Sequence, residues 1–254
     1  MVTFIVGTGY KQETFQIHKQ IACEHSEVWN RAFNSVFVEG QTQTYRIEDT
    51  DPEVFRLLTQ WVYREEFDHV HSGDLNASHS DDFASMVRCI DEDSALLQLW
   101  VLAEKFMIPR LQNYTIRVLC NKVLICNPNL SYKDCRYVYD NTAEGSALRC
   151  FVIEHSCWSR AFGLHDRDLV SYPVEMLGDI IMALKRQLPE NEVFSDDWGQ
   201  LSVLGGSNYR ILIGSGIEQF CEEWVRRVVS LVDWRESDDE LSALCSVKSA
   251  HRLF

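Results

Sequence analysis

The chain has 254 residues, enough for one large domain or two small ones, and 46% of them are hydrophobic, which excludes disorder along its whole length. Acidic residues outnumber basic ones by 38 to 24, for a net charge of −14. Since affinity for nucleic acid comes mainly from basic groups that neutralise phosphates, this balance argues against nucleic acid and anionic membrane surfaces as partners.

Nine cysteines are spread along the chain, an odd number with no Cys-x-x-Cys pair. Several fall in apolar segments with a helical period, which is typical of reduced, buried thiols in an intracellular protein. The apolar residues 2–6 are too few for a signal peptide, and no apolar run is long enough to span a bilayer. We therefore expect an intracellular protein, in the cytoplasm or the nucleus.

The N-terminal residues predict a small sheet with short helices. Residues 2–6 and 13–17 are rich in residues that favour strands and are expected to form a hairpin. Residues 18–35 predict two short helices that break at Ser26, a residue suited to cap the second one. A third strand is expected over residues 42–47.

The next segment predicts longer helices. One begins at Pro52, with Asp51 as its N-cap. Residues 65–82 lose the helical period and predict a loop. A helix with apolar residues at i, i+3, i+4 and i+7 is expected from about Asp93, and a proline separates it from a second helix that starts near Arg110.

Beyond Pro128 the chain is predicted to be all helical. Apolar stripes run over residues 148–158 and 173–188, and a polar, glycine-containing loop is expected over residues 189–208. A last amphipathic helix is predicted over residues 217–231. Its apolar residues are Ile217, Phe220, Cys221, Trp224, Val225, Val228 and Leu231.

Part of the chain contains sequence motifs in the order in which they occur in a known family. The segments that carry the likeness are Phe15-Gln16-Ile17-His18-Lys19, Asp49-Thr50-Asp51-Pro52-Glu53-Val54-Phe55 and Trp61-Val62-Tyr63. They resemble the core of a BTB/POZ domain, in which a strand ends in His-Lys, a helical hairpin follows, and an Asp-x-Asp-Pro strand end precedes a helix with a terminal aromatic pair. The signature residues are His18, Lys19, Ser26, Asp49, Asp51 and Tyr63.

The resemblance implies an α+β protein whose first part has the BTB/POZ fold, a small sheet of about three strands with helical hairpins. We expect this domain over residues 1–126, followed by an all-α extension over residues 127–254. BTB domains bind proteins and perform no chemistry, so the resemblance implies an interaction module, an adaptor or scaffold, and not an enzyme.

The resemblance also implies a candidate partner. BTB adaptors of cullin ubiquitin ligases often carry a bulky apolar residue, any residue and then Glu after the first helical hairpin. Phe37 and Glu39 stand at these positions, and Phe33 lies four residues earlier. An exposed aromatic side chain can fill a pocket on a partner helix while a carboxylate sets the register. We therefore expect a cullin scaffold to contact Phe33, Phe37 and Glu39, although a pattern of three positions also arises by chance.

Self-association is the alternative for a BTB domain. Dimeric members usually exchange a helix and strand that precede the first core strand, whereas this sequence starts at the core strand itself. The Asp often found shortly before the His-Lys pair is also absent, because residues 11–13 are Lys-Gln-Glu. Both departures favour a resemblance to the short, monomeric members of the superfamily, which link subunits in ligase complexes. The sequence leaves the homodimer open.

The remaining polar clusters predict no cofactor, metal or catalytic site. His69, His71 and His79 lie with several aspartates in one segment, but a structural zinc site needs about four rigidly held ligands. The glycines at 7 and 9 and at 214 and 216 do not complete a dinucleotide or phosphate motif. A metal-dependent enzyme with its site in the C-terminal half is the least favoured hypothesis.

Overall fold

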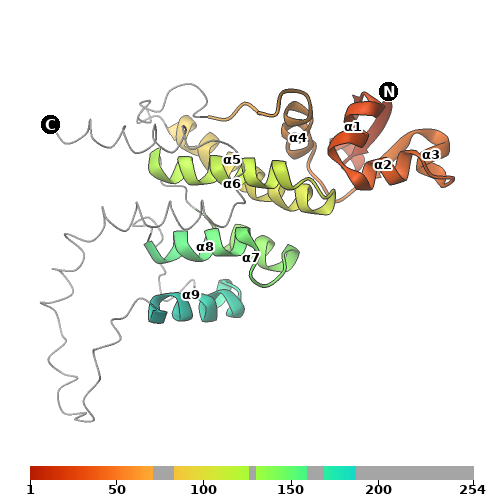
Figure 1. The fold of residues 1–254 in the computed structure, drawn as a ribbon. Coiled ribbons are helices and arrows are strands. Elements are labelled where there is room, and N and C mark those ends of the chain that lie inside the picture. Colours follow the sequence, from red (N-terminus) through yellow and green to blue (C-terminus); the bar gives the residue numbers. More distant parts are fainter. Residues whose placement is uncertain (71–82, 126–129, 159–168, 187–254) are drawn as a thin grey trace, which may run out of the picture.

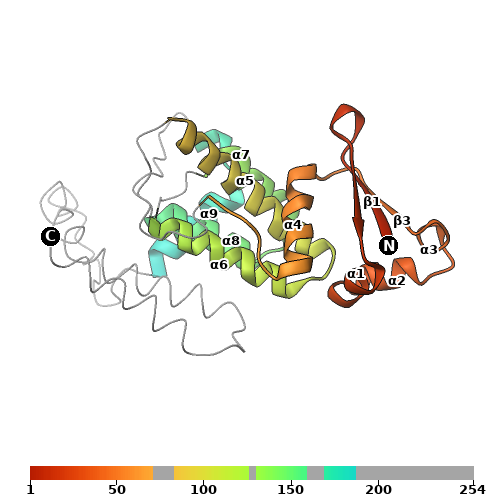
Figure 2. The ribbon, with the colours of Figure 1, turned by 90° about the horizontal axis from the view of Figure 1, so that it is seen from above.

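The fold places a small sheet, a central pair of long helices and a further helical layer in succession (Figure 1). The structure, a computed structural model, describes residues 1–70, 83–125, 130–158 and 169–186. Figure 2, seen from above, shows α4 standing between the sheet and the α5–α6 pair.

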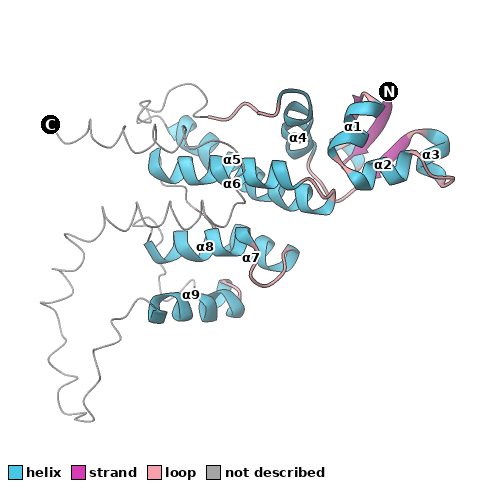
Figure 3. Ribbon diagram, viewed as in Figure 1, coloured by secondary structure: helices cyan, strands magenta, loops and turns pink. Residues whose placement is uncertain are grey.

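One mixed sheet is present in the described residues, with the strand order β2–β1–β3. Its strands are β1 (Val2–Val6), β2 (Glu13–Ile17) and β3 (Thr44–Ile47). The central strand pairs antiparallel with β2 and parallel with β3, so that Phe4 stands opposite Phe15 on one side and Tyr45 on the other. The expected strands are confirmed, and with the helices around them they give the α+β class (Figure 3).

Short helices cover the sheet. They are α1 (Lys19–His25), α2 (Glu27–Phe33), α3 (Val38–Thr42) and α4 (Pro52–Arg64), and the one-turn helix η1 (Gly9–Lys11) connects the first two strands. Ser26 breaks α1 from α2 as expected, because its side-chain oxygen accepts the Trp29 N–H and caps the second helix. Asp51 caps α4 in the same way, accepting from the Glu53 N–H at 2.9 Å.

Longer helices follow. The central pair consists of α5 (Phe83–Lys105) and α6 (Pro109–Ile125), and the next layer consists of α7 (Tyr132–Asn141), α8 (Ala147–Trp158), the one-turn helix η2 (Leu169–Ser171) and α9 (Val174–Arg186). The turn between α5 and α6 contains Met107 in the left-handed conformation, with φ 54°. Figure 1 shows α7, α8 and α9 lying along one side of the α5–α6 pair.

The core is continuous from the sheet to the last helices. Phe4 lies at its aromatic centre, with ring centroids 4.9 Å from Trp29 and 5.1 Å from Phe55. Phe106, the residue that follows α5, packs on Trp29 with ring centroids 5.0 Å apart and so joins the sheet unit to the central pair. Fully buried residues of α8, such as Phe151, belong to the same cluster.

Two expectations about element bounds were wrong. The short helix α3 lies in a segment where no helix was expected. The helix expected from about Asp93 begins at Phe83, ten residues earlier. The predicted polar loop at 189–208, the glycines at 214 and 216 and the helix expected over 217–231 lie outside the described residues.

Candidate partner-binding surface

An apolar tip projects where the connection from α2 enters the first turn of α3. It consists of Val36, Phe37 and Val38, whose exposed fractions are 83%, 70% and 67%. Three consecutive large apolar side chains this exposed are unusual on a monomeric surface and are typical of a contact with another protein. We call these three residues the apolar tip.

Hydrogen bonds hold the backbone of the tip in one conformation. The Ser35 hydroxyl donates to the Ala32 carbonyl at 2.8 Å and accepts the Phe37 N–H at 3.1 Å. From the other side, the Gln41 side-chain amide donates to the Val36 carbonyl at 2.8 Å. The apolar side chains are therefore exposed on a backbone that is already ordered, which lowers the entropy cost of binding.

A second set of hydrogen bonds anchors the base of the tip. The Phe33 carbonyl accepts from Lys19 Nζ at 2.9 Å and from the Gln43 side-chain amide at 3.0 Å. Gly40 packs so closely on this segment that a Cβ atom there would lie 1.9 Å from the Ser35 carbonyl oxygen. Only glycine fits at this position, so α3 and the tip form one unit.

The three predicted contact residues do not share one surface. Phe37 is exposed and Glu39 is partly exposed in the first turn of α3. Phe33, by contrast, is only 1% exposed, and its ring meets the Phe4 ring edge-on at 5.5 Å. The expectation that Phe33 contacts a partner is therefore corrected: its side chain belongs to the core, one helical turn after the buried Trp29.

The tip lies at the opposite end of the sheet from the β1–β2 turn. The parallel pairing starts with Thr3 opposite Thr44, just after α3, and ends with Val6 opposite Ile47. Tyr10, in the connection between β1 and β2, is 96% exposed and lies beyond that other end. Phe37 and Tyr10, both exposed, therefore belong to segments at opposite ends of the sheet, and Figure 2 shows the β1–β2 connection and α3 lying apart from each other.

The signature residues are internal ties of the fold. The backbone N–H of His18 donates to the Tyr63 hydroxyl at 3.0 Å, and the same hydroxyl lies 2.8 Å from Nδ1 of the His18 ring. This pair fixes the end of β2 against the last turn of α4. Lys19, the next signature residue, anchors the base of the apolar tip through the Phe33 carbonyl.

The other signature residues tie separate helices together. Ser26 is fully buried, and its hydroxyl donates to the Phe106 carbonyl at 2.7 Å, across to the end of α5. Asp49 forms a salt bridge with Lys105 at 2.7 Å, and the hydrogen bond from Lys105 lowers the pKa of the Asp49 carboxyl. Asp51 caps α4. These residues form a framework of hydrogen bonds, a cap and a salt bridge within the fold.

Sequence reasoning missed a buried ionic cluster between α5 and α6. Lys122 Nζ lies 2.6 Å from Glu92 Oε2 and 2.6 Å from Asp93 Oδ1, and it donates to the Cys89 carbonyl at 3.2 Å. The second oxygen of Glu92 accepts the Val70 N–H at 2.7 Å. The only sign of this cluster in the sequence is a lysine within an otherwise apolar face of α6.

Burial and charge together set the protonation of this cluster. Removal from water raises the pKa of Asp93 to about 6, an effect that the attraction of Lys122 only partly offsets. The two carboxylates raise the pKa of Lys122 and keep it charged. One cation between two carboxylates therefore holds the α5–α6 pair together, and the site has no access for a substrate, because Lys122 and Asp93 are almost fully buried.

The histidine-rich segment contributes no metal site to the described part. Of its residues, Asp68 forms a salt bridge with Arg64 at 2.8 Å, whereas His71, His79 and their neighbouring aspartates lie outside the described residues. Across residues 1–70, 83–125, 130–158 and 169–186, no group of three or more His, Cys, Asp or Glu side chains could hold a metal ion. No helix in these same ranges combines the length and apolarity needed to cross a bilayer.

Comparison with known proteins places the N-terminal part in a family. The family model of the BTB/POZ domain matches residues 2–122. This range contains the sheet, the apolar tip, all the signature residues, α5 and most of α6. No curated protein sequence matches the chain significantly.

Proposed function

Residues 2–122 make this chain a BTB/POZ domain-containing protein, and from that premise we propose that it is an intracellular adaptor that recruits a cullin ubiquitin ligase through the apolar tip. BTB domains are protein-interaction modules, so the function to be identified is a partner and not a reaction. The observation that carries the proposal is the exposure of Phe37, 70%, on a backbone braced by side-chain hydrogen bonds.

The geometry of the tip suits insertion into a pocket. Phe37 has an apolar neighbour on each side, which extends the apolar contact beyond one ring. Glu39 lies two residues further, in the first turn of α3, where a carboxylate is stabilised by the helix dipole and can pair with a basic group of the partner. In this arrangement Phe37 supplies affinity and Glu39 supplies orientation.

The domain boundary follows from the same proposal. We place the interaction module in residues 1–126 and propose that residues 127–254 are a helical extension of it. The cysteines support an intracellular location: Cys23, Cys89, Cys120, Cys135, Cys150 and Cys157, those in the described ranges, are all free thiols.

The test is binding of the purified protein to the N-terminal region of a cullin. We expect Phe37→Ala combined with Glu39→Ala to weaken binding at least tenfold, because both side chains lie in the proposed contact. Both residues are at least partly exposed, so the thermal unfolding temperature should stay within a few degrees of the parent's. Tyr10→Ala is the matched control, since it removes an aromatic ring that is 96% exposed at the other end of the sheet and should leave binding unchanged.

Two results would contradict the cullin proposal. One is a double variant that binds the cullin as tightly as the parent. The other is a parent that binds no cullin while light scattering shows a stable dimer. The second result would favour the alternative function, a BTB scaffold that acts by self-association.

A further inference from the structure

The apolar face of α9 is buried along one edge and exposed over the rest of its width. Met176 and Ile180 lie at the buried edge, where α9 packs on α7 and α8. Val174, Ile181 and Met182 lie on the exposed side, with exposed fractions of 78%, 64% and 50%. Large apolar side chains gathered on a surface in this way are typical of a contact with another protein.

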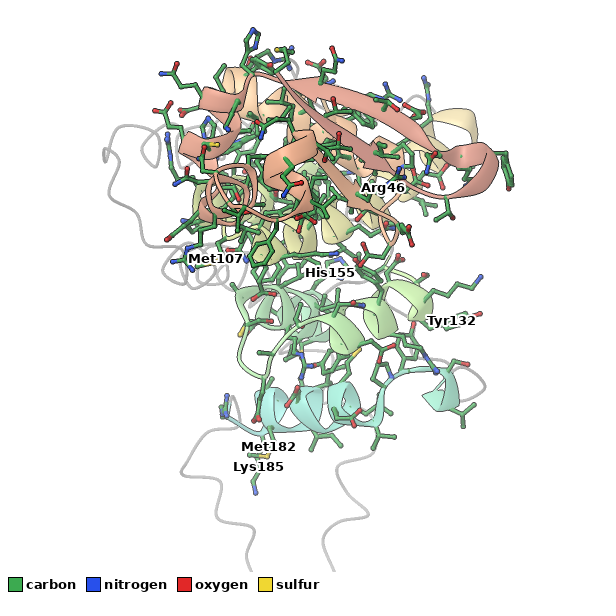
Figure 4. All side chains as sticks on the ribbon, turned by 90° about the vertical axis from the view of Figure 1, so that its right-hand side faces the viewer. Arg46, Met107, Tyr132, His155, Met182 and Lys185 are labelled. Carbon is green, nitrogen blue, oxygen red and sulfur yellow. The ribbon has the colours of Figure 1, made fainter. Side chains whose placement is uncertain are left out.

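This exposed side points away from the fold. Figure 4 shows Met182 and Lys185 on the side of α9 that is turned away from the rest of the molecule. Among residues 1–70, 83–125, 130–158 and 169–186, no element covers this side, because its residues remain exposed. We call it the outer face of α9 and define it by Val174, Glu175, Gly178, Ile181, Met182 and Lys185.

A glycine stands at the centre of the outer face. The other five residues of the face lie within about 60° of Gly178 around the helix axis, because successive residues are about 100° apart. In the described part of the chain, a Cβ atom on Gly178 would have no heavy atom within 4 Å. Gly178 does not have a positive φ either, although glycine inside a helix is less stable than alanine. A second helix that crosses closely at this point would use the missing side chain.

The charges of the outer face complement a second copy of the same face. Glu175 lies in the first turn of α9, and Lys185 lies in the last turn. When two such helices cross antiparallel, each lysine comes close to the glutamate of the other helix, whereas a parallel pair brings like charges together. The dipoles of the two helices also oppose each other in the antiparallel pair. A face with this property is self-complementary about a two-fold axis.

We propose that the protein forms a symmetric dimer in which the outer face of α9 packs antiparallel on the outer face of a second copy, with Gly178 at the two-fold axis. Val174 of one copy then faces Met182 of the other, because each lies four residues from Gly178. The face of one 13-residue helix is smaller than the roughly 800 Å² per partner of a standard interface, so the dimer is weak, with a Kd of about 10–100 μM. The proposal is independent of the cullin contact, which uses the apolar tip.

Sedimentation of the full-length protein over a range of concentrations tests the dimer. The weight-average mass should rise from monomer to dimer as the concentration passes through the expected Kd. Ile181→Asp places a charge from each copy near the two-fold axis and should keep the protein monomeric. Tyr132→Asp is the matched control, because it makes the same kind of change at an exposed position on α7 (Figure 4). A parent that stays monomeric, or an Ile181→Asp variant that dimerises like the parent, would overturn the proposal.

Gly178→Leu separates the dimer contact from the stability of the monomer. Leucine has open space at this position and favours a helix more than glycine does, so the thermal unfolding temperature should not fall. The two helices can no longer approach closely, and the Kd should increase at least tenfold. An unchanged Kd would contradict the position of Gly178 at the axis.

Exchange of the two charges tests the antiparallel orientation. Glu175→Lys and Lys185→Glu should each increase the Kd about fivefold, because each change replaces an attraction between the copies with a repulsion. The double variant restores opposite charges and should dimerise like the parent. A double variant that stays as weak as the single ones would rule out this orientation. Phe37→Ala with Glu39→Ala should leave the Kd unchanged, and loss of the dimer there would assign self-association to the apolar tip instead.

Discussion

The ionic cluster formed by Lys122, Glu92 and Asp93 sets the charge balance in the interior of the α5–α6 pair. A lysine that is 1% exposed would be strongly destabilising alone, and the carboxylates on either side of it make its charge tolerable. Because there are two carboxylates and one cation, a negative charge remains in excess. That excess and the burial together favour the protonated form of Asp93.

Asp93 should therefore give the stability of the protein a distinct dependence on pH. Its pKa is about 6 in the folded protein, above the ordinary value of 3.8 that applies when unfolded. The folded state takes up the proton first, so the contribution of Asp93 to the free energy of unfolding increases as pH falls from about 6 toward about 4, by up to about 1.4 kcal/mol per pH unit. The contribution is lost again as pH rises through 6.

The measurement is urea unfolding at several pH values for the parent and Asp93→Asn. Asparagine resembles the protonated carboxyl and does not titrate, so the variant should gain stability relative to the parent as pH rises through this window. Asp68→Asn, which removes a charge at an exposed position, is the control for net charge. Parallel pH profiles for the parent and Asp93→Asn would contradict the prediction. Lys122→Met removes the cation instead of a carboxylate. The free energy of unfolding should then fall by about 3–5 kcal/mol, because two buried carboxylates are left unpaired.

At the scale of elements, Ser26 makes two separate hydrogen bonds that join different helices. Its hydroxyl caps α2 and also donates to the carbonyl of Phe106, the residue that follows α5. Ser26→Ala should lower the free energy of unfolding by about 2–3 kcal/mol, since it removes a cap and leaves a buried carbonyl without its donor. The urea midpoint should fall with an unchanged m-value.

Asp51→Ala provides the comparison for Ser26→Ala. It removes a cap of the same kind from α4, but at a position that is partly exposed to water, so a loss of only about 1 kcal/mol is expected. Equal losses in the two variants would show that the bond from Ser26 to Phe106 contributes nothing beyond the cap.

The elements also show where sequence patterns suffice. Strands, caps and the α4 helix were predictable, because Ser26, Asp51 and Pro52 act through local chemistry that depends on residue type and spacing. The helix α3 was not, because its five residues contain a glycine and it depends on packing against Ser35. The start of α5 was missed because its first residues lack a clear apolar stripe in the sequence.

The residues of the candidate surface also divide into those that the sequence predicted and those that it did not. A motif matched to a family selected Phe37 and Glu39 as candidates, and both side chains are at least partly exposed. Phe33 was assigned to the surface by its spacing from Phe37, although its spacing of four residues from Trp29 already places both on one side of α2. Val36 and Val38 could be assigned to the surface only from the structure. In a sequence, a run of apolar residues is equally typical of a buried strand.

At the scale of the whole molecule, the helical extension is built onto the BTB domain. The Ser94 hydroxyl on α5 donates to Asp134 Oδ1 at 2.6 Å, and Asp134 also forms the capping box of α7 with Ser131. The hydrophobic core continues without a break from the sheet to α8 and α9. A boundary near residue 126 therefore separates two segments of sequence that share one core.

Shared packing predicts shared unfolding. If α8 is released only when the whole described structure opens, a variant that destabilises α2 must accelerate hydrogen exchange in α8 as well. Under conditions where the most buried amides exchange through global unfolding, Ser26→Ala should speed exchange of α4 and α8 by the same factor, about 30-fold for 2 kcal/mol. Mass spectrometry of peptides from the two helices measures both rates in one sample. Acceleration confined to α4 would mean that α7–α9 open as a separate unit despite the common core, and the hydrogen bond from Ser94 to Asp134 would then be a contact between two independently stable domains.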